Sequence, residues 1–299
     1  MLRGADPQIF MFAAAYRQAA SFTKPVIISH VRVDGQCFAG VGTFVVVNAE
    51  GWILTSNHIM TEYAKLAQAK QAAKDRAAAI EAIQQNAGLL PDQKRKQIKK
   101  LGDLANKAAT DFSFWWAADG VVVKDVHAIP SADIAVGRLD PFDGAAITNY
   151  PTFKDPTKAI LNGTSLCRLG FPFHEIKPTY AGGTFTLPPD TFPMVFFPNE
   201  GILTRVLIVD QNAPIFAGFI ETSSPGLKGQ SGGPIFDQHG TVWGIQSHTE
   251  NLPLGFSPSV PGRPDQREHQ FLNVGRGTHP GTIVGLLNQI GVKHAISAY

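Results

Sequence analysis

The sequence is poor in cysteine, nearly neutral in charge and without a long apolar run. Two cysteines, Cys37 and Cys167, occur in 299 residues, and they lie too far apart for the paired spacing of zinc ligands or for a disulfide framework. No apolar stretch reaches the roughly 18 residues that a membrane-spanning helix needs. We therefore expect no metal site, no cofactor and no membrane span.

The net charge and the N-terminal residues indicate whether the protein binds nucleic acid and whether it carries a signal peptide. The formal net charge is +2, too small for the whole chain to act as a nucleic-acid-binding surface. Asp6 and Pro7 interrupt any signal-like pattern at the N-terminus, and no long apolar segment follows them. With 44% hydrophobic and 17% charged residues, the composition is that of a soluble globular protein, and we expect it in the cytoplasm.

Short apolar segments bounded by turn residues predict a protein made mainly of β-strands. The expected strands cover residues 26–33, 42–48, 52–56, 112–117, 121–126, 165–169, 201–209, 216–222 and 242–247. A leading helix is expected from Gln8 to Ala20, because Asp6 and Pro7 resemble an N-cap followed by a first-turn proline. A closing helix is expected from Thr282 to Ile290.

Residues 61–110 differ from the rest because they are rich in Ala, Lys and Gln. They predict a helical hairpin, with one helix over about residues 62–86, a break at 88–91 and a second helix from Asp92. The second helix is expected to carry Ile98, Leu101, Leu104 and Ala108 on one face. The segment holds ten Lys or Arg residues against five acids. This excess fits either a solvated helix face or a docking surface for an acidic or regulatory protein partner.

The residues most informative about chemistry form the loop Gly229-Gln230-Ser231-Gly232-Gly233-Pro234. Glycines beside a serine let backbone N–H groups converge on one point, where the oxyanion of an acyl-transfer intermediate could lie. A serine becomes nucleophilic at neutral pH only with a base, and the base needs an orienting partner. His58 directly follows the expected strand 52–56, and Asp133 opens the apolar run Ile134-Ala135-Val136. These two residues are our candidates for the base and its partner.

With these three motifs in this order, the chain resembles the trypsin-like (chymotrypsin-fold) serine proteases, most closely the bacterial Deg/HtrA-type protease domain. The resemblance covers roughly residues 26–292 without the helical insertion, and the chain leaves no room for the PDZ domains of many such proteins. It implies a mainly β fold of two six-stranded antiparallel β-barrels, with an inserted helical hairpin and terminal helices. The expected division is 1–23 for the N-terminal helix, 24–150 for the first barrel with the 61–110 insertion, 151–280 for the second barrel and 281–299 for the C-terminal helix and tail.

The resemblance also implies roles for individual residues in the cleavage of a peptide or protein substrate. His58 would be the general base and then the general acid, Asp133 would orient it, and Ser231 would attack the scissile carbonyl. The backbone N–H groups of Gly229 and Ser231 would form the oxyanion hole. Ser247 would line the substrate cleft beside these residues.

Two positions depart from the digestive branch of that family. Gln230 replaces the aspartate that pairs with a newly cut amino terminus, so activation by N-terminal cleavage is not expected. Pro225 stands at the substrate-cleft position of the trypsin specificity aspartate, so cleavage after Lys or Arg is not expected and a small or medium apolar side chain is favoured. Activity should rise with pH as His58 loses its proton.

Parts of the sequence also fit two other classes of protein. The serine loop also fits the nucleophile elbow of α/β-hydrolases, which would make the chain an esterase or lipase. That fold needs its acid and histidine after the serine and a βαβ alternation, which this sequence lacks. The second alternative is an inactive trypsin-fold scaffold that binds partners through the basic hairpin.

Overall fold

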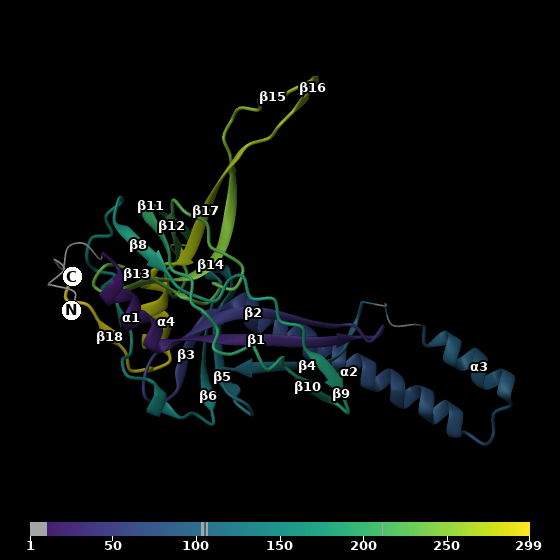
Figure 1. Cartoon of the computed structure of the whole chain (residues 1–299). Coiled ribbons are helices and arrows are strands. Elements are labelled where there is room, and N and C mark those ends of the chain that lie inside the picture. The colour runs from purple at the N-terminus through teal and green to yellow at the C-terminus, as the bar shows by residue number, and fades with distance from the viewer. Residues whose placement is uncertain (1–10, 103–104, 106, 211) are drawn as a thin grey trace.

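Two β-sheets make up most of the computed structural model, which describes residues 11–102, 105, 107–210 and 212–299 (Figure 1). The first sheet has the antiparallel order β4-β1-β2-β3-β6-β5. Its strands are β1 (Thr23–Arg32), β2 (Cys37–Val46), β3 (Trp52–Ser56), β4 (Ala109–Trp116), β5 (Val122–Ile129) and β6 (Ile134–Asp140). Strand β3 covers the expected residues 52–56, and the prediction of a mainly β protein is confirmed.

The second sheet contains a closed ring of six strands. Its order is β13-β8-β11-β12-β17-β14, and β13 also pairs with β14, which closes the ring. The strands are β8 (Ser165–Arg168), β11 (Asn199–Asp210), β12 (Ala217–Thr222), β13 (Pro234–Phe236), β14 (Val242–Pro253) and β17 (Phe271–Thr278). The short strands β7 (Thr152–Phe153) and β18 (Ala295–Ile296) add to its edge by parallel pairing. A separate small hairpin consists of β9 (Thr179–Ala181) and β10 (Thr184–Thr186).

The largest apolar cluster takes buried side chains from both sheets. Leu54 of β3 and Val136 of β6 belong to the same buried cluster as Phe236 of β13 and Ile245 of β14. The terminal helices α1 (Ala13–Phe22) and α4 (Pro280–Gln289) pack buried side chains against this cluster. Burying these faces together holds one sheet against the other. Our domain boundaries within the chain stay predictions.

The terminal helices differ in detail from their expected bounds. The start of the first helix, expected at Gln8 after Asp6 and Pro7, lies outside the described residues. Its described part runs on to Phe22, two residues beyond the expected end. The closing helix begins at Pro280 instead of Thr282, and the His279 ring accepts a hydrogen bond from the Gly281 N–H group at its start.

The predicted helical hairpin forms one of two projections from the body in Figure 1. It consists of α2 (Asn57–Gln85) and α3 (Pro91–Lys100), and it begins five residues earlier than expected. Because α3 ends at Lys100, Ala108 does not share a helix face with Ile98, and Leu104 lies outside the described residues.

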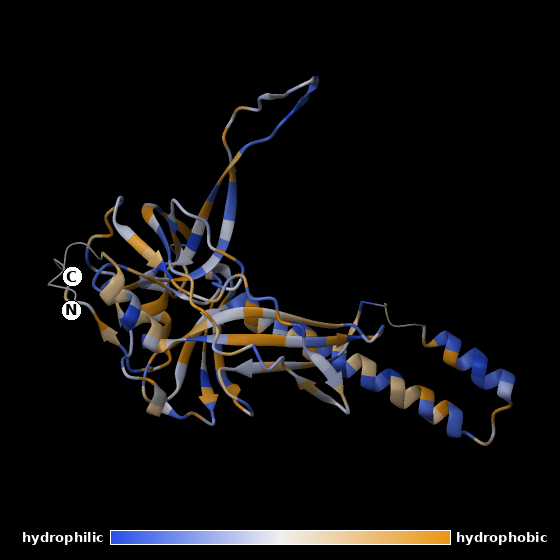
Figure 2. Ribbon diagram, viewed as in Figure 1, coloured by the Kyte–Doolittle hydropathy of each residue, from blue (hydrophilic) through white to orange (hydrophobic). Residues whose placement is uncertain are grey.

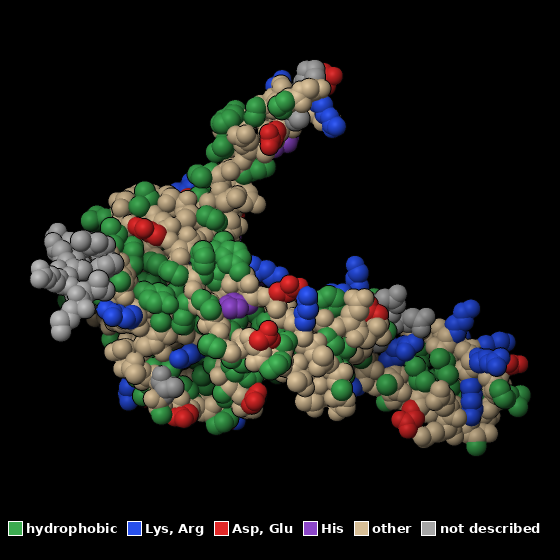
Figure 3. All heavy atoms as spheres, viewed as in Figure 1, with side chains coloured by type: hydrophobic (Ala, Val, Ile, Leu, Met, Phe, Trp, Pro, Cys, Tyr) green, Lys and Arg blue, Asp and Glu red, His purple; other side chains and the backbone are tan. Residues whose placement is uncertain are grey.

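Only the base of this projection is anchored to the first sheet. Ile59 and Leu66 are the buried residues of α2, and α3 has none. The Tyr63 ring packs against the rings of Phe112 and Phe114 on β4, at centroid distances of 5.4 and 5.2 Å. Figure 2 shows α3 as mostly hydrophilic, and Figure 3 shows Lys and Arg side chains gathered at its end of the hairpin.

The second projection is a ribbon that continues β14 and β17, with β15 (Ser259–Val260) and β16 (Arg263–Arg267) at its tip (Figure 1). Strand β14 runs to Pro253, six residues beyond its expected end at Ser247. The extension carries His248, Thr249 and Glu250, whose polar character hid it from the apolar pattern. No helix in the described part of the chain is both long and apolar enough to cross a membrane.

Removing the outer part of the helical projection should leave the fold intact. Arg76 Nε donates to the Gly102 carbonyl at 2.9 Å, so these two points are close enough to join when residues 77–101 are replaced by a short glycine linker. We expect the Tm to stay within about 2 °C of the parent, because no residue in 77–101 is buried. Thermal unfolding monitored by circular dichroism measures this.

A longer deletion of residues 62–109 is the matched comparison. It also removes Leu66, Tyr63 and the ion pair between Lys70 and Asp111, and it should lower the Tm clearly. Equal Tm values for the two deletions would contradict this account of where the hairpin is anchored.

Candidate active site

Asp133 lies where the two sheets meet and holds several groups in place. Its carboxylate accepts hydrogen bonds from His58 Nδ1 (2.9 Å), from the His58 backbone N–H (2.9 Å) and from Ser247 Oγ (2.5 Å). Its backbone has a φ of 49°, in the left-handed region that aspartate adopts more readily than most residues. The Asp133 carbonyl accepts from the Asn57 N–H at 3.1 Å.

The environment of Asp133 favours its ionised form. Burial alone would raise the pKa of this carboxyl group, since its side chain is only 18% exposed. Hydrogen bonds from His58 and Ser247, together with the charge of His58, outweigh burial and hold the pKa below its usual range.

His58 follows the strand β3, as expected, and it lies in the first turn of α2, because this helix begins at Asn57 and not near residue 62. The N-cap residue, Ser56, makes no side-chain cap, and Asp133 instead accepts from the first N–H groups of the helix, those of Asn57 and His58. Helices begin where such N–H groups find acceptors. The acceptor here comes from 75 residues further along the chain, so the local sequence does not reveal the helix start.

The His58 ring and the Ser231 hydroxyl each have another partner in this structure. With Nδ1 donating to Asp133, Nε2 accepts from Ser56 Oγ at 3.3 Å. Ser231 Oγ donates to the Ser247 carbonyl at 3.3 Å. Ser247 therefore contacts both Ser231, through its carbonyl, and Asp133, through its hydroxyl.

The Ser231 loop is fixed by the first sheet. The Thr43 N–H on β2 donates to the Ser231 carbonyl at 2.8 Å, and Thr43 Oγ1 donates to the Gly229 carbonyl at 2.7 Å. Gly229 has a φ of 99°, and a Cβ there would lie 2.3 Å from the Phe171 carbonyl oxygen. Gly232 has a φ of 85°, and a Cβ there would lie 2.0 Å from the Thr43 carbonyl oxygen. Only glycine fits these two positions.

Two N–H groups in this loop are available to a ligand. The N–H groups of Gly229 and Ser231 donate no hydrogen bond to any described residue, whereas that of Gln230 between them donates to the Leu227 carbonyl. Unpaired donors on either side of a paired one form a small anion-binding site. The two donors belong to the residues that we expected to supply the oxyanion hole.

Gln230 holds the rest of this loop. Its side chain is fully buried, with Oε1 accepting from the Leu227 N–H at 2.9 Å and Nε2 donating to the Phe197 carbonyl at 3.0 Å. Both ends of the amide are thus used inside the protein. A neutral side chain that is satisfied in this way needs no charged amino terminus as its partner.

The site is also surrounded by polar groups that the sequence analysis did not single out. His248 Nδ1 lies 2.8 Å from Ser247 Oγ and acts as the donor, because the single hydroxyl proton goes to Asp133. Burial, and then the nearby Arg276 guanidinium, lower the pKa of His248. Neither His248 nor Ser56 belongs to a recognisable sequence motif, so only their positions next to the site in the structure identify them.

Pro225, expected in the cleft, is half-buried, and its carbonyl accepts from Asn199 Nδ2 and Arg168 Nη1.

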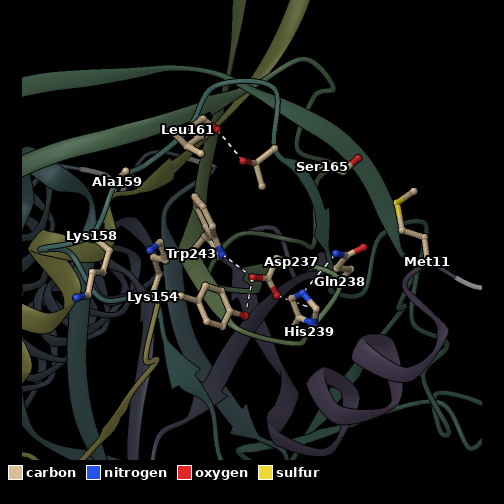
Figure 4. Close-up of a pocket in the computed structure, with 12 residues that line it drawn as sticks. Met11, Lys154, Lys158, Ala159, Leu161, Ser165, Asp237, Gln238, His239 and Trp243 are labelled. Atoms are coloured by element: carbon tan, nitrogen blue, oxygen red, sulfur yellow. Dashed lines mark hydrogen bonds between the residues drawn. The ribbon is translucent and has the colours of Figure 1, made fainter. Parts of the chain in front are cut away.

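A separate cavity of about 560 Å³ lies elsewhere on the second sheet (Figure 4). Lys154 lies near the rings of Trp243 and Tyr299, and Asp237 accepts from Trp243 Nε1 at 3.0 Å. Its lining includes none of the residues that we expected at the active site.

Both cysteines are free thiols. Burial raises the pKa of Cys167 to about 12, whereas Cys37 is only partly buried. Within the described residues, no three His, Cys, Asp or Glu side chains cluster as metal ligands would.

The sequence matches the family model of the trypsin-like peptidase domain over residues 42–245, and the chain belongs to this family. It is therefore a trypsin-like serine protease, with a peptide or protein as its substrate. The match spans the three motifs around His58, Asp133 and Ser231, and the two β-sheets agree with the expected trypsin-like fold.

Solved structures with some similarity include the Rv3671c protease of M. tuberculosis. Its active form is 14% identical with a TM-score of 0.46, and the comparison covers 98% of this chain and 90% of that one. Its inactive form is 14% identical with a TM-score of 0.43, covering 97% of this chain and 99% of that one. No curated protein sequence matched.

Replacing Asp133 by Asn should lower stability in a pH-dependent way. Because the native pKa of Asp133 is depressed, its carboxylate stabilises the fold at pH above the unfolded value of about 3.9, and this stabilisation is lost as pH falls through the lower native pKa. We expect the Tm difference between parent and Asp133→Asn to be largest near about pH 7 and to shrink near about pH 3.

The control is Asp143→Asn, which removes the same charge at an exposed turn. Differential scanning calorimetry at both pH values measures the effect. A Tm difference for Asp133→Asn that is the same at both values would show that the ionised carboxylate does not stabilise the native state.

Proposed function

We propose that this chain is a serine endopeptidase that cleaves peptide bonds through Ser231, His58 and Asp133 by way of an acyl-enzyme. One observation carries the proposal, which is that Ser247 connects Ser231 to the hydrogen-bonded pair of Asp133 and His58. A nucleophile, a base and a partner that fixes the base are the three parts that acyl transfer by serine requires.

The chemical steps follow from these groups. The Ser231 hydroxyl turns from the Ser247 carbonyl towards His58 Nε2, which releases Ser56. His58 takes the proton as the Ser231 oxygen bonds to the substrate carbonyl carbon, and Asp133 stabilises the resulting imidazolium. The N–H groups of Gly229 and Ser231 stabilise the oxyanion. His58 then gives the proton to the leaving amine, and water activated by His58 hydrolyses the acyl-enzyme.

A cavity beside the oxyanion donors supports this assignment. It has a volume of about 390 Å³, and its lining includes Leu227, Lys228 and Gly229 of the serine loop with Val41 and Phe171. A substrate whose carbonyl oxygen meets the Gly229 N–H could place neighbouring residues there. Pockets next to convergent polar groups are where substrates usually bind.

The nucleophile and the base can be tested separately. A fluorophosphonate probe should label Ser231 in the parent chain and fail to label Ser231→Ala. Cleavage of a peptide by Ser231→Ala or His58→Ala should fall by a factor on the order of 10⁴ to 10⁶ in kcat.

Ser165→Ala on β8 and His239→Ala serve as matched controls outside the site, and both should keep the parent activity. Equal labelling of parent and Ser231→Ala would remove Ser231 as the nucleophile. Cleavage by His58→Ala at the parent rate would exclude His58 as the general base. No labelling and no cleavage by the parent would favour the inactive binding scaffold.

We also propose that the helical projection regulates the enzyme by engaging an acidic partner. The specific observation is that His58 lies in the first turn of α2 while its Nε2 is held by Ser56. A force on the basic outer hairpin would act on the turn that carries the base. A partner that moves this turn could exchange Ser56 for Ser231 at Nε2.

Inorganic polyphosphate, a polyanion that cannot itself be cleaved as a peptide, is the probe for this proposal. It should raise the peptide-cleavage rate of the full chain several-fold, and it should not raise that of the variant in which a linker replaces residues 77–101. An equal response of both proteins, including none, would refute regulation through the hairpin.

A further inference from the structure

Arg168 is buried, and no carboxylate of the described residues pairs with it. It lies on β8 within the apolar run Leu166-Cys167-Arg168-Leu169, and it is only 1% exposed. A fully buried guanidinium is ordinarily paired with an acid. Among the described residues Arg168 forms no ion pair, and its Nη1 donates only to Ser224 Oγ (2.8 Å) and the Pro225 carbonyl (3.2 Å).

The two remaining nitrogens of Arg168 have no partner in the described part of the chain. Both Nε and Nη2 are buried donors without a hydrogen bond. They lie on the same edge of the guanidinium plane, which is the edge that matches the two oxygens of a carboxylate. Burial lowers the pKa of Arg168 to about 10, so the group still carries its charge at neutral pH.

The guanidinium contacts a residue that the resemblance places in the substrate cleft. Pro225, whose carbonyl it contacts, lies six residues before Ser231 at the position expected to close the primary specificity pocket. Gly275 of β17 lies on another side, where a Cβ would come within 2.5 Å of Arg168 Nη2. The absence of a side chain at Gly275 leaves room for this edge of the guanidinium.

The neighbouring wall is also polar. Gln246, next to Ser247 on β14, is buried, and its Oε1 has no partner among the described residues. Its amide packs against Gly226, where a Cβ would lie 2.1 Å from Nε2. An apolar substrate side chain would leave the Nε and Nη2 donors of Arg168 unsatisfied, which is unfavourable. This argues against our sequence-based preference for an apolar side chain at this position.

We propose that Arg168 selects substrates with an acidic side chain, Glu above Asp, on the amino side of the cleaved bond. The carboxylate accepts from Nε and Nη2, and the longer Glu side chain reaches the base of the pocket better than Asp does. This inference rests on the proposed endopeptidase function and names its substrate class.

The test compares two chromogenic peptides that differ only in having Glu or its neutral isostere Gln before the cleaved bond. We expect kcat/KM for the Glu peptide to exceed that for the Gln peptide by about 10- to 100-fold, because a charge-assisted bidentate contact is lost with Gln. Equal rates, or faster cleavage after Gln or after Leu in a third peptide, would overturn the inference.

Arg168→Met, which nearly conserves volume and removes the charge, should bring the ratio of Glu to Gln cleavage close to one. Arg138→Met, at an exposed arginine of the first sheet, should keep the parent ratio. If Arg168→Met does not fold, the comparison of Glu and Gln peptides with the parent chain still decides the matter.

Fluorophosphonate labelling separates this inference from the function on which it rests. A parent chain whose Ser231 is labelled, but which shows no preference for Glu, retains the proposed function and loses the inference. A parent chain that is neither labelled nor active loses both.

Discussion

The carboxylate of Asp133 is the point on which the arrangement of the site depends. It fixes the His58 ring, accepts from the first turn of α2 and binds Ser247 of the second sheet. The same group therefore sets the orientation of the base, the start of a long helix and a contact between the two sheets. A buried carboxylate is stable only with such partners. Here the partners are His58 itself and Ser247, which also contacts Ser231.

The two projections of the molecule both begin within this network. Helix α2 starts at Asn57 beside His58, and β14 passes through Ser247 before it extends into the ribbon. The serine loop is held from the opposite side by Thr43 and by the buried amide of Gln230. His58 and Ser231, which would carry out the chemistry, are thus held by hydrogen bonds to both sheets. The elements that project into solvent, α2 and β14, are continuous with the segments that carry His58 and Ser247. Such continuity gives a physical route by which binding outside the body could act on His58.

Much of the fold could be predicted because the signals are local. The strand Trp52–Ser56 and the run from Ile134 have apolar patterns that depend on few neighbours, and glycines mark the Ser231 loop. The start of α2 could not be predicted, because its capping group, Asp133, is 75 residues away. The extension of β14 was hidden because it begins with the polar residues His248, Thr249 and Glu250, and it pairs with β17.

In the candidate site, too, the features set by local sequence could be predicted and those set by contacts between distant residues could not. Its three principal residues stand in recognisable motifs, and the structure brings them into one connected set. The contacts of Ser56, His248 and Gln230 depend on side-chain positions that no spacing reveals. For Arg168 a signal was present, since a lone arginine in an apolar strand is unusual, but its meaning requires the fold that places it against Pro225.

The most direct test of this account is a crystal structure with a peptide boronic acid, which mimics the tetrahedral intermediate. We expect a bond between Ser231 Oγ and boron, with one boronate oxygen between the N–H groups of Gly229 and Ser231. We also expect that Nδ1 of His58 stays on Asp133 while Nε2 turns from Ser56 to the boronate. An inhibitor that is not bonded to Ser231, or a His58 ring detached from Asp133, would contradict this account.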